Sequence, residues 1–160
     1  MKKKIIIVII ILFICLSGGL YLFGEITGNQ NIATKCVEKI NTMRFDQKLE
    51  KNVKAVENNK KPSVPKLSEM EVVDVMHKMA NTKVIADKKW GFVKITKERI
   101  KNLKTIVSES NYKEKEKLLE ILNKWEEGNF SEADKDHNFL WDKLGGTVGK
   151  AKGVLKEEQN

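Results

Sequence analysis

The sequence predicts an all-α protein with an N-terminal transmembrane helix, a stalk, and a compact bundle of four to five short helices. The first observation is an uncharged apolar run from Ile5 to Phe23. The second is the segment NNKKPSVPKL, which contains both prolines of the chain and is typical of an extended linker. The third is the helical spacing of apolar residues beyond that linker. These observations divide the chain into an anchor (1–24), a basic stalk (25–66), a helical domain (67–155) and a short tail (156–160).

The apolar run Ile5–Phe23 is long enough to cross a bilayer. Its nineteen residues would span about 30 Å as a helix, which matches the hydrocarbon core. Three lysines at positions 2–4 favour a cytoplasmic N-terminus. Bulky Leu22 stands where signal peptidase cleavage after Gly24 would require a small residue. We therefore expect a single-pass signal anchor in the cell membrane, with the rest of the chain outside the cytoplasm.

Positive charge is concentrated in the stalk. The whole chain has a formal net charge of +8. Residues 25–66 contain nine basic and five acidic side chains, whereas residues 67–160 contain eighteen and seventeen. The stalk lysines could contact anionic lipid head groups or an anionic wall polymer, or they could simply be solvated. Nucleic acid is an unsuitable partner, because the expected location is wrong and aromatic and basic residues do not interleave.

The stalk has only loose helical spacing. Apolar residues recur from Val37 to Met43, but Phe45 and Asp46 interrupt the pattern. A solvated helix or a self-pairing helix is compatible with this spacing. Cys36 is the only cysteine beyond the anchor, so no disulfide can form within the extracytoplasmic part. Cys36 is either idle or paired with another molecule.

Capping signals open the first two predicted helices of the domain. Ser68 and Glu71 have the spacing of a capping box, and Leu67 and Val72 are placed as a hydrophobic staple. An irregular or extended link follows this helix, and Thr96 then opens the second helix. The expected core stripes of these two helices are Val72, Val75, Met76 and Met79, and Ile100, Leu103, Ile106 and Val107.

Two more helices are expected in the second half of the domain. Asn111 with Glu114 opens the third helix, and Gly128 ends it. Ser131 with Asp134 opens the fourth. Their expected inward residues are Leu118, Ile121, Leu122 and Trp125, and Ala133, Leu140, Trp141 and Leu144.

The segment GGTVGKAKG, which begins at residue 145, is neither a phosphate loop nor the end of a calcium loop. A phosphate loop would need glycine at position 144 and Ser or Thr at position 151, where the chain has Leu144 and Ala151. A calcium loop starting at Asp134 would need glycine at position 139 and glutamate at position 145, where the chain has Phe139 and Gly145.

The glycines of this segment instead indicate backbone roles. Gly145 and Gly146 can end the fourth helix, and Thr147 can cap a short fifth helix. Gly149 and Gly153, four residues apart, would then lie on one side of that helix and allow close approach. The approaching group is either another part of the domain or a partner or second copy; otherwise the segment is a frayed tail.

Two stretches resemble a known family. These are DVMHKMANTKVIADKKWG (74–91) and WEEGNFSEADKDHNFLWDKLGGTVGKAKGVL (125–155). They are similar to the conserved blocks of an uncharacterised domain family of small Bacillus-type exported or membrane-anchored proteins. The resemblance covers most of residues 67–155 and implies a domain type and a Gram-positive source. It implies no activity and assigns no catalytic residue.

Two histidines are the main candidates for chemistry. His77 and His137 each lie beside an apolar stripe, where histidine is usually a hydrogen-bonded core residue. Alternatively, Asp74 lies one turn before His77 and Asp136 adjoins His137, so two helices could assemble a zinc or acid–base site. No fixed-spacing metal motif supports that alternative.

The three tryptophans are expected to anchor the core. Trp90, Trp125 and Trp141 could also line a ligand groove, but a domain this small needs large apolar side chains in its interior. Asn138 is the one polar residue that neither capping nor solubility explains.

The leading functional hypothesis is a membrane-tethered, non-catalytic interaction module that binds a protein, a cell-envelope component or a second copy, without a cofactor. Whether the protein is an enzyme stays open. The alternative is a small metal-binding domain or metal-dependent hydrolase that uses His77, His137, Asp74 and Asp136. The expected contact surface is residues 138–155, and the candidate binding residues are Asp136, His137, Asn138, Trp141, Gly145, Gly146, Gly149 and Gly153.

Overall fold

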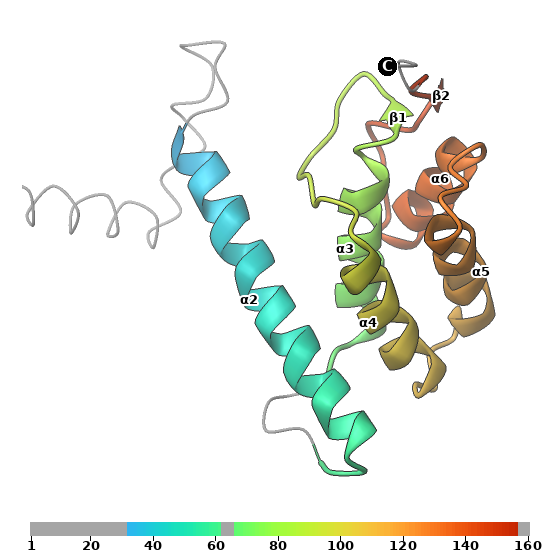
Figure 1. Cartoon of the computed structure of the whole chain (residues 1–160). Coiled ribbons are helices and arrows are strands. Elements are labelled where there is room, and N and C mark those ends of the chain that lie inside the picture. Colours follow the sequence, from blue (N-terminus) through green and yellow to red (C-terminus); the bar gives the residue numbers. More distant parts are fainter. Residues whose placement is uncertain (1–31, 62–65, 157–160) are drawn as a thin grey trace, which may run out of the picture. The chain divides into compact units, whose positions relative to one another are not determined.

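A computed structural model describes residues 32–61 and 66–156, so the expected anchor Ile5–Phe23 lies outside the described residues. Within these ranges the protein has five helices and a two-stranded sheet, which makes it mostly helical as predicted (Figure 1). No helix in the described ranges is long and apolar enough to cross a membrane. In chain order the elements are α2 (Ile32–Glu57), α3 (Glu69–Ala80), β1 (Val84–Ile85), α4 (Lys97–Ser108), α5 (Lys115–Glu126), α6 (Ala133–Lys143) and β2 (Gly153–Val154).

The chain forms two compact units, and their boundary falls within α2, between Lys39 and Ile40. α2 continues without interruption through Phe45 and Asp46, where the apolar spacing of the sequence is interrupted. In the second unit, Leu49 and Val53 of α2 belong to the main hydrophobic core. The Asp46 carboxylate accepts two hydrogen bonds from the Arg99 guanidinium of α4, at 2.9 and 2.6 Å.

The helices α3 and α4 begin as the capping pattern predicted. The Ser68 hydroxyl accepts a hydrogen bond from the Glu71 backbone N–H, and the Glu71 carboxylate accepts one from the Ser68 N–H. The Thr96 hydroxyl accepts the Arg99 N–H at the start of α4. Both predicted core stripes are buried: Val72, Val75, Met76 and Met79 in α3, and Ile100, Leu103, Ile106 and Val107 in α4.

The predicted caps of the other two helices are wrong. α5 begins at Lys115, later than expected, because the carboxylate of Glu69 in α3 accepts the N–H groups of Lys113 and Glu114. α6 begins at Ala133 without a side-chain cap, and the Ser131 hydroxyl donates to the Asn129 side chain instead. The stripes of these helices hold in part: Leu118, Ile121, Leu122, Trp125, Ala133 and Leu140 are buried, whereas Trp141 and Leu144 are half-buried.

The predicted fifth helix does not form. Residues 153–154 make strand β2, which pairs antiparallel with β1 so that Val84 faces Val154 and Ile85 faces Gly153. Outside this pair, the Leu155 N–H donates to the Lys83 carbonyl. A strand is favoured because it satisfies the backbone groups of two segments distant in sequence at once.

The sheet joins two irregular segments at one end of the helices. We call residues 82–96, between α3 and α4, the link, and residues 145–156, after α6, the C-terminal segment. α3 packs on α6, α4 packs on α5, and both strands contact α6. Figure 1 shows β1 and β2 beyond the end of α3, with the link looping back from β1 toward α4. The elements therefore place the link beside the C-terminal segment.

Candidate binding surface

A buried imidazole connects the link to α6. His137 is 1% exposed, and its Nε2 lies 3.0 Å from Oδ1 of Asn81, the C-cap residue of α3. The Asn81 amide nitrogen donates to the carbonyls of Trp90 and Gly91, at 3.0 and 2.9 Å. One amide thus holds the middle of the link against the end of α3.

A second amide holds the C-terminal segment. Asn138 follows His137 in α6, and its side chain pairs with the backbone of Ala151 in both directions. Its nitrogen donates to the Ala151 carbonyl at 3.0 Å, and its oxygen accepts the Ala151 N–H at 2.7 Å. This pairing explains Asn138, the polar residue without a role in the sequence pattern. We call Asn81, His137 and Asn138 the amide–imidazole network.

The network fixes the proton on one nitrogen of His137. Both hydrogens of the Asn81 amide are used on carbonyls, so its oxygen must accept, and Nε2 of neutral His137 carries the proton. Nδ1 then lies 3.2 Å from the Asn138 oxygen, which already accepts from Ala151. Burial lowers the pKa of His137, the Asn138 contact opposes that shift, and the Lys89 ammonium adds to it. The neutral form follows from this balance.

The two histidines meet in space. The ring centroids of His77 and His137 are 4.5 Å apart and the rings are tilted by 42°. His77 is 9% exposed, and its Nε2 is buried without a hydrogen-bond partner in the described part of the chain. Burial, then the neighbouring His137, lowers the pKa of His77 to about 4, although Asp74 acts in the opposite direction. His77 is therefore neutral near pH 7.

The two aspartates of the metal hypothesis face other partners. Asp74 is ion-paired with Lys78 at 2.6 Å. Asp136 accepts from Lys124 Nζ at 2.6 Å and from the indole N–H of Trp125 at 3.2 Å, which ties α6 to α5. In residues 32–61 and 66–156 no three His, Cys, Asp or Glu side chains are grouped to hold a metal ion. The fold brings the histidines together, and both carboxylates are paired with lysines.

Gly145 and Gly146 end α6 in a Schellman motif. Gly145 has φ +69° and donates to the Asp142 carbonyl, while Gly146 donates to the Trp141 carbonyl. A Cβ on Gly146 would lie 2.2 Å from the Trp141 indole, so this position has no room for a side chain. The same indole donates its N–H to the Val148 carbonyl at 2.9 Å. Trp141 therefore directs the C-terminal segment as it leaves the helix.

Gly149 and Gly153 have different roles, because they do not share a helix. Gly149 has φ +91°, and a Cβ there would lie 2.4 Å from the Lys88 carbonyl oxygen and 3.2 Å from the Trp90 ring. Close approach at Gly149 was predicted, and the link is what approaches. Gly153 has open space at its Cβ position and lies in β2, opposite Ile85.

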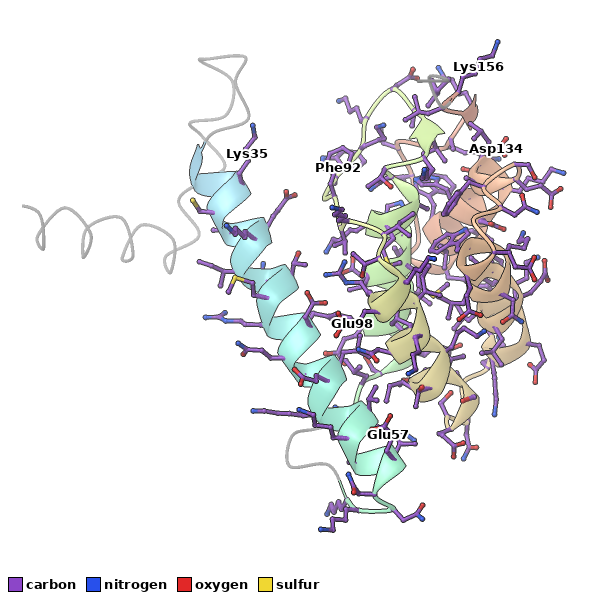
Figure 2. All side chains as sticks on the ribbon, viewed as in Figure 1. Lys35, Glu57, Phe92, Glu98, Asp134 and Lys156 are labelled. Atoms are coloured by element: carbon purple, nitrogen blue, oxygen red, sulfur yellow. The ribbon has the colours of Figure 1, made fainter. Side chains whose placement is uncertain are left out.

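The contact at Gly149 creates an exposed surface of aromatic and basic side chains. Trp90, which lies over Gly149, is 57% exposed, so its prediction as a core anchor is wrong. Val148 adjoins Gly149 and is 48% exposed, and Phe92 on the link is 43% exposed. We call Lys88, Trp90, Phe92, Val148 and Lys150, all exposed, the aromatic–lysine surface. Figure 2 draws these side chains and labels Phe92 on the link and Lys156 at the far end of the C-terminal segment.

The link and the C-terminal segment are positively charged, although the net charge of the whole domain is near zero. The link and the C-terminal segment together contain seven basic side chains and one acidic side chain, Asp87. Residues 67–81 and 97–144, which contain α3 to α6, have eleven basic and fourteen acidic side chains. The domain therefore separates its charge, and the aromatic–lysine surface lies in the positive part.

A hollow of about 340 Å³ lies next to β2. Val154 and Leu155 border it on one side, and the loop between α5 and α6, with Phe130, borders it on the other. Lys83 Nζ lies over the Phe130 ring, 4.4 Å from its centroid. The hollow adds apolar surface to the same pair of segments.

The sequence pattern missed Asn81 and the exposed aromatics of the link. Asn81 follows the last turn of α3, where a cap explains it locally, and only the fold shows that it contacts His137. Trp90 and Phe92 stand among lysines, next to Gly91, which has φ +75°. That lysine-rich context was the available signal that these aromatics are exposed.

Comparison with known proteins gives a family but no activity. Residues 76–160 match the model of a family described as a family of unknown function (DUF6241). The match covers more than half of the chain and includes the network and the surface. No curated protein and no solved structure matches the chain.

Proposed function

We propose that this chain, which belongs to the family of unknown function DUF6241, is a membrane-tethered, non-catalytic interaction module. The apolar run Ile5–Phe23 would hold it in the cell membrane with the helical domain outside the cytoplasm. The aromatic–lysine surface would contact a protein or another component of the cell envelope. The stalk lysines would add a weaker, salt-sensitive attraction to anionic material.

One observation carries the proposal: an exposed tryptophan is held in place by buried polar contacts. Asn81 binds the Trp90 carbonyl, and Gly149 leaves space that the Trp90 ring covers. A large aromatic side chain, fixed and exposed beside other apolar groups, is typical of a binding surface. Because the Trp90 backbone is already held by Asn81, binding would cost little further backbone conformational entropy.

The contacts of Asp136, His137 and Asn138 support binding rather than catalysis. His137 contacts the Asn81 side chain, Asn138 holds the Ala151 backbone, and Asp136 holds Lys124 and Trp125. Each of these side chains, which the sequence offered as a candidate for chemistry, has a structural partner. The residues of the predicted site thus support the surface, and the surface would make the contact.

Photocrosslinking in intact cells tests this function. A photoreactive amino acid replaces Trp90 in the full chain, and in a matched control it replaces Met70, which is 50% exposed in the first turn of α3. We expect a distinct crosslinked species from position 90 that is absent from position 70. Identical products from both positions, or none from position 90, would refute the proposed contact surface.

The metal-binding alternative has one observation in its favour, the contact of two imidazoles with an unpartnered Nε2 on His77. It predicts stoichiometric zinc in the purified full chain and its loss in His77→Phe. Equal, substoichiometric zinc in both proteins would remove this alternative. The crosslinking result does not depend on this outcome.

A further inference from the structure

We propose that the aromatic–lysine surface binds the surface of a bilayer that contains anionic phospholipids. This inference rests on the proposed function and names the partner of the same surface. It follows from three properties of the described residues: where the aromatics lie, how the charge is distributed, and which partner both kinds of side chain suit together.

The apolar and basic side chains belong to one continuous region. The Trp90 ring lies over Gly149, whose neighbours in the chain are Val148 and Lys150. The carbonyl of Lys88 faces the same glycine. Lys89, which precedes Trp90 in the link, donates from Nζ to the Val84 carbonyl, and this nitrogen lies 5.5 Å from the centroid of the Phe92 ring. Contacts between the link and the C-terminal segment therefore hold both kinds of side chain together.

The charge favours an anionic partner. The two segments have seven basic residues against one acidic residue, and Lys152 pairs with that acid, Asp87, at 2.6 Å. The part of the chain that contains α3 to α6 (67–81 and 97–144) carries an excess of acidic residues. An anionic surface would attract the link and the C-terminal segment and repel the part that contains α3 to α6, which would orient these elements.

The exposed apolar groups favour a lipid surface over a soluble polyanion. Lysines alone would suffice for an anionic polymer, and such a partner would leave Trp90, Phe92 and Val148 in water. At a bilayer, Trp and Phe enter the interfacial region while neighbouring lysines contact the head groups. The expected anchor would keep the domain near the membrane, so that even weak surface affinity would give high occupancy.

Quenching of Trp90 by brominated lipid tests the inference. The full chain is reconstituted into vesicles of phosphatidylcholine alone or mixed with phosphatidylglycerol, with brominated acyl chains as the quencher. Of the three tryptophans, Trp125 is buried and Trp141 is half-buried, so Trp90→Phe removes the expected reporter. We expect quenching in the anionic vesicles that is lost in Trp90→Phe and weakened by salt.

Two sets of control variants test whether quenching depends on the position of the tryptophan and on the charge of the neighbouring lysines. Trp90→Phe combined with Met70→Trp moves the exposed tryptophan to an equally exposed site outside the surface, and we expect it to remain unquenched. Lys88→Glu with Lys150→Glu should abolish quenching of Trp90. The same reversals at Lys97 and Lys101, which are exposed on α4, should leave it unchanged. Matching thermal unfolding curves establish that the variants are folded.

The outcomes distinguish failure of the lipid proposal from failure of the proposed contact surface. Quenching that survives Trp90→Phe, or is equal in neutral vesicles, overturns the inference. Absent quenching with a persistent crosslink from position 90 in cells overturns the lipid partner and leaves the proposed function standing. If the quenching and the crosslink are both absent, the lipid partner and the proposed function are both refuted.

Discussion

At the scale of single residues, the most unusual group is the imidazole of His77. It lies against the His137 ring, its Nε2 has no partner in the described residues, and its pKa is lowered to about 4. Asp74 and Lys78 of its own helix and His137 of α6 are the ionisable groups that affect it. Protonation of His77 would place a charged ring in a buried position beside the His137 ring, and the fold resists this.

The lowered pKa predicts that acid destabilises the protein through His77. Because the folded-state pKa of about 4 lies below the ordinary value of 6.5, the unfolded chain takes up the proton first. The contribution of neutral His77 to the free energy of unfolding is complete above pH 6.5. It falls by about 3 kcal/mol as the pH decreases toward 4. His77→Phe keeps a ring against His137 and removes the titration. Urea unfolding of both proteins measures the difference between their free energies of unfolding, which should change by this amount from pH 7 to pH 4. A difference that stays constant over this range would contradict the assignment.

The contact between Gly146 and Trp141 predicts a coupling. Gly146→Ala places a methyl group in the indole and should lower the free energy of unfolding by about 1–3 kcal/mol. In a Trp141→Ala background the same change should cost almost nothing, because the obstructing ring is gone. Chemical denaturation of the four proteins measures the coupling. Additive effects would show that the ring does not occupy this space.

Local spacing could predict that each histidine lies on a helix beside an apolar stripe. It could not predict that the two rings meet or that Asn81 contacts His137, because these pairs come from segments far apart in sequence. The role of Asn138 was likewise hidden, since its partner Ala151 is thirteen residues away. The sequence could therefore single out these residues as candidates, and their structural contacts required the fold.

At the scale of elements, prediction succeeded where a helix carries its own start signal. α3 and α4 each have a local hydroxyl cap, and both begin where the sequence indicated. The start of α5 depends on Glu69 of α3, which no local pattern reveals. The C-terminal segment has helical apolar spacing, yet pairing with β1 and the positive φ of Gly149 give it an extended, irregular course.

The amide–imidazole network predicts how firmly the C-terminal segment is held. Asn138→Ala removes both hydrogen bonds to Ala151 and should speed amide exchange of Ala151, Lys152 and Leu155 roughly tenfold. Asn129→Ala is the matched control, because that side chain serves only the exposed turn at Ser131 among the described contacts. Equal exchange in the three proteins would show that the sheet alone holds the segment.

At the scale of the whole molecule, α2 contributes to the domain that follows it. Leu49 is 1% exposed and belongs to the main core, whereas Met43 on the same helix is 52% exposed. Leu49→Ala should lower the free energy of unfolding by about 2–5 kcal/mol. Met43→Ala should change it by less than about 0.5 kcal/mol. Equal, small effects in thermal and urea unfolding would show that the second half of α2 is dispensable for the fold.

The fold class was predictable because most of the core comes from amphipathic helices with regular spacing. The two-stranded sheet was not, since each strand has only two residues and lacks a strand pattern of its own. The charge separation was also hidden, because a sum over residues 67–160 cancels the basic link against the acidic helices. Only the pairing of the link with the C-terminal segment makes their lysines one region.

The central claim is that the amide–imidazole network presents Trp90 to a partner outside the chain. Crosslinking in intact cells from a photoreactive residue at position 90, with Asn138 and with Asn138→Ala, tests it most directly. We expect a crosslinked species that is strongly reduced by Asn138→Ala at equal protein level and is unaffected by Asn129→Ala. A crosslink of the same intensity in all three proteins would contradict it.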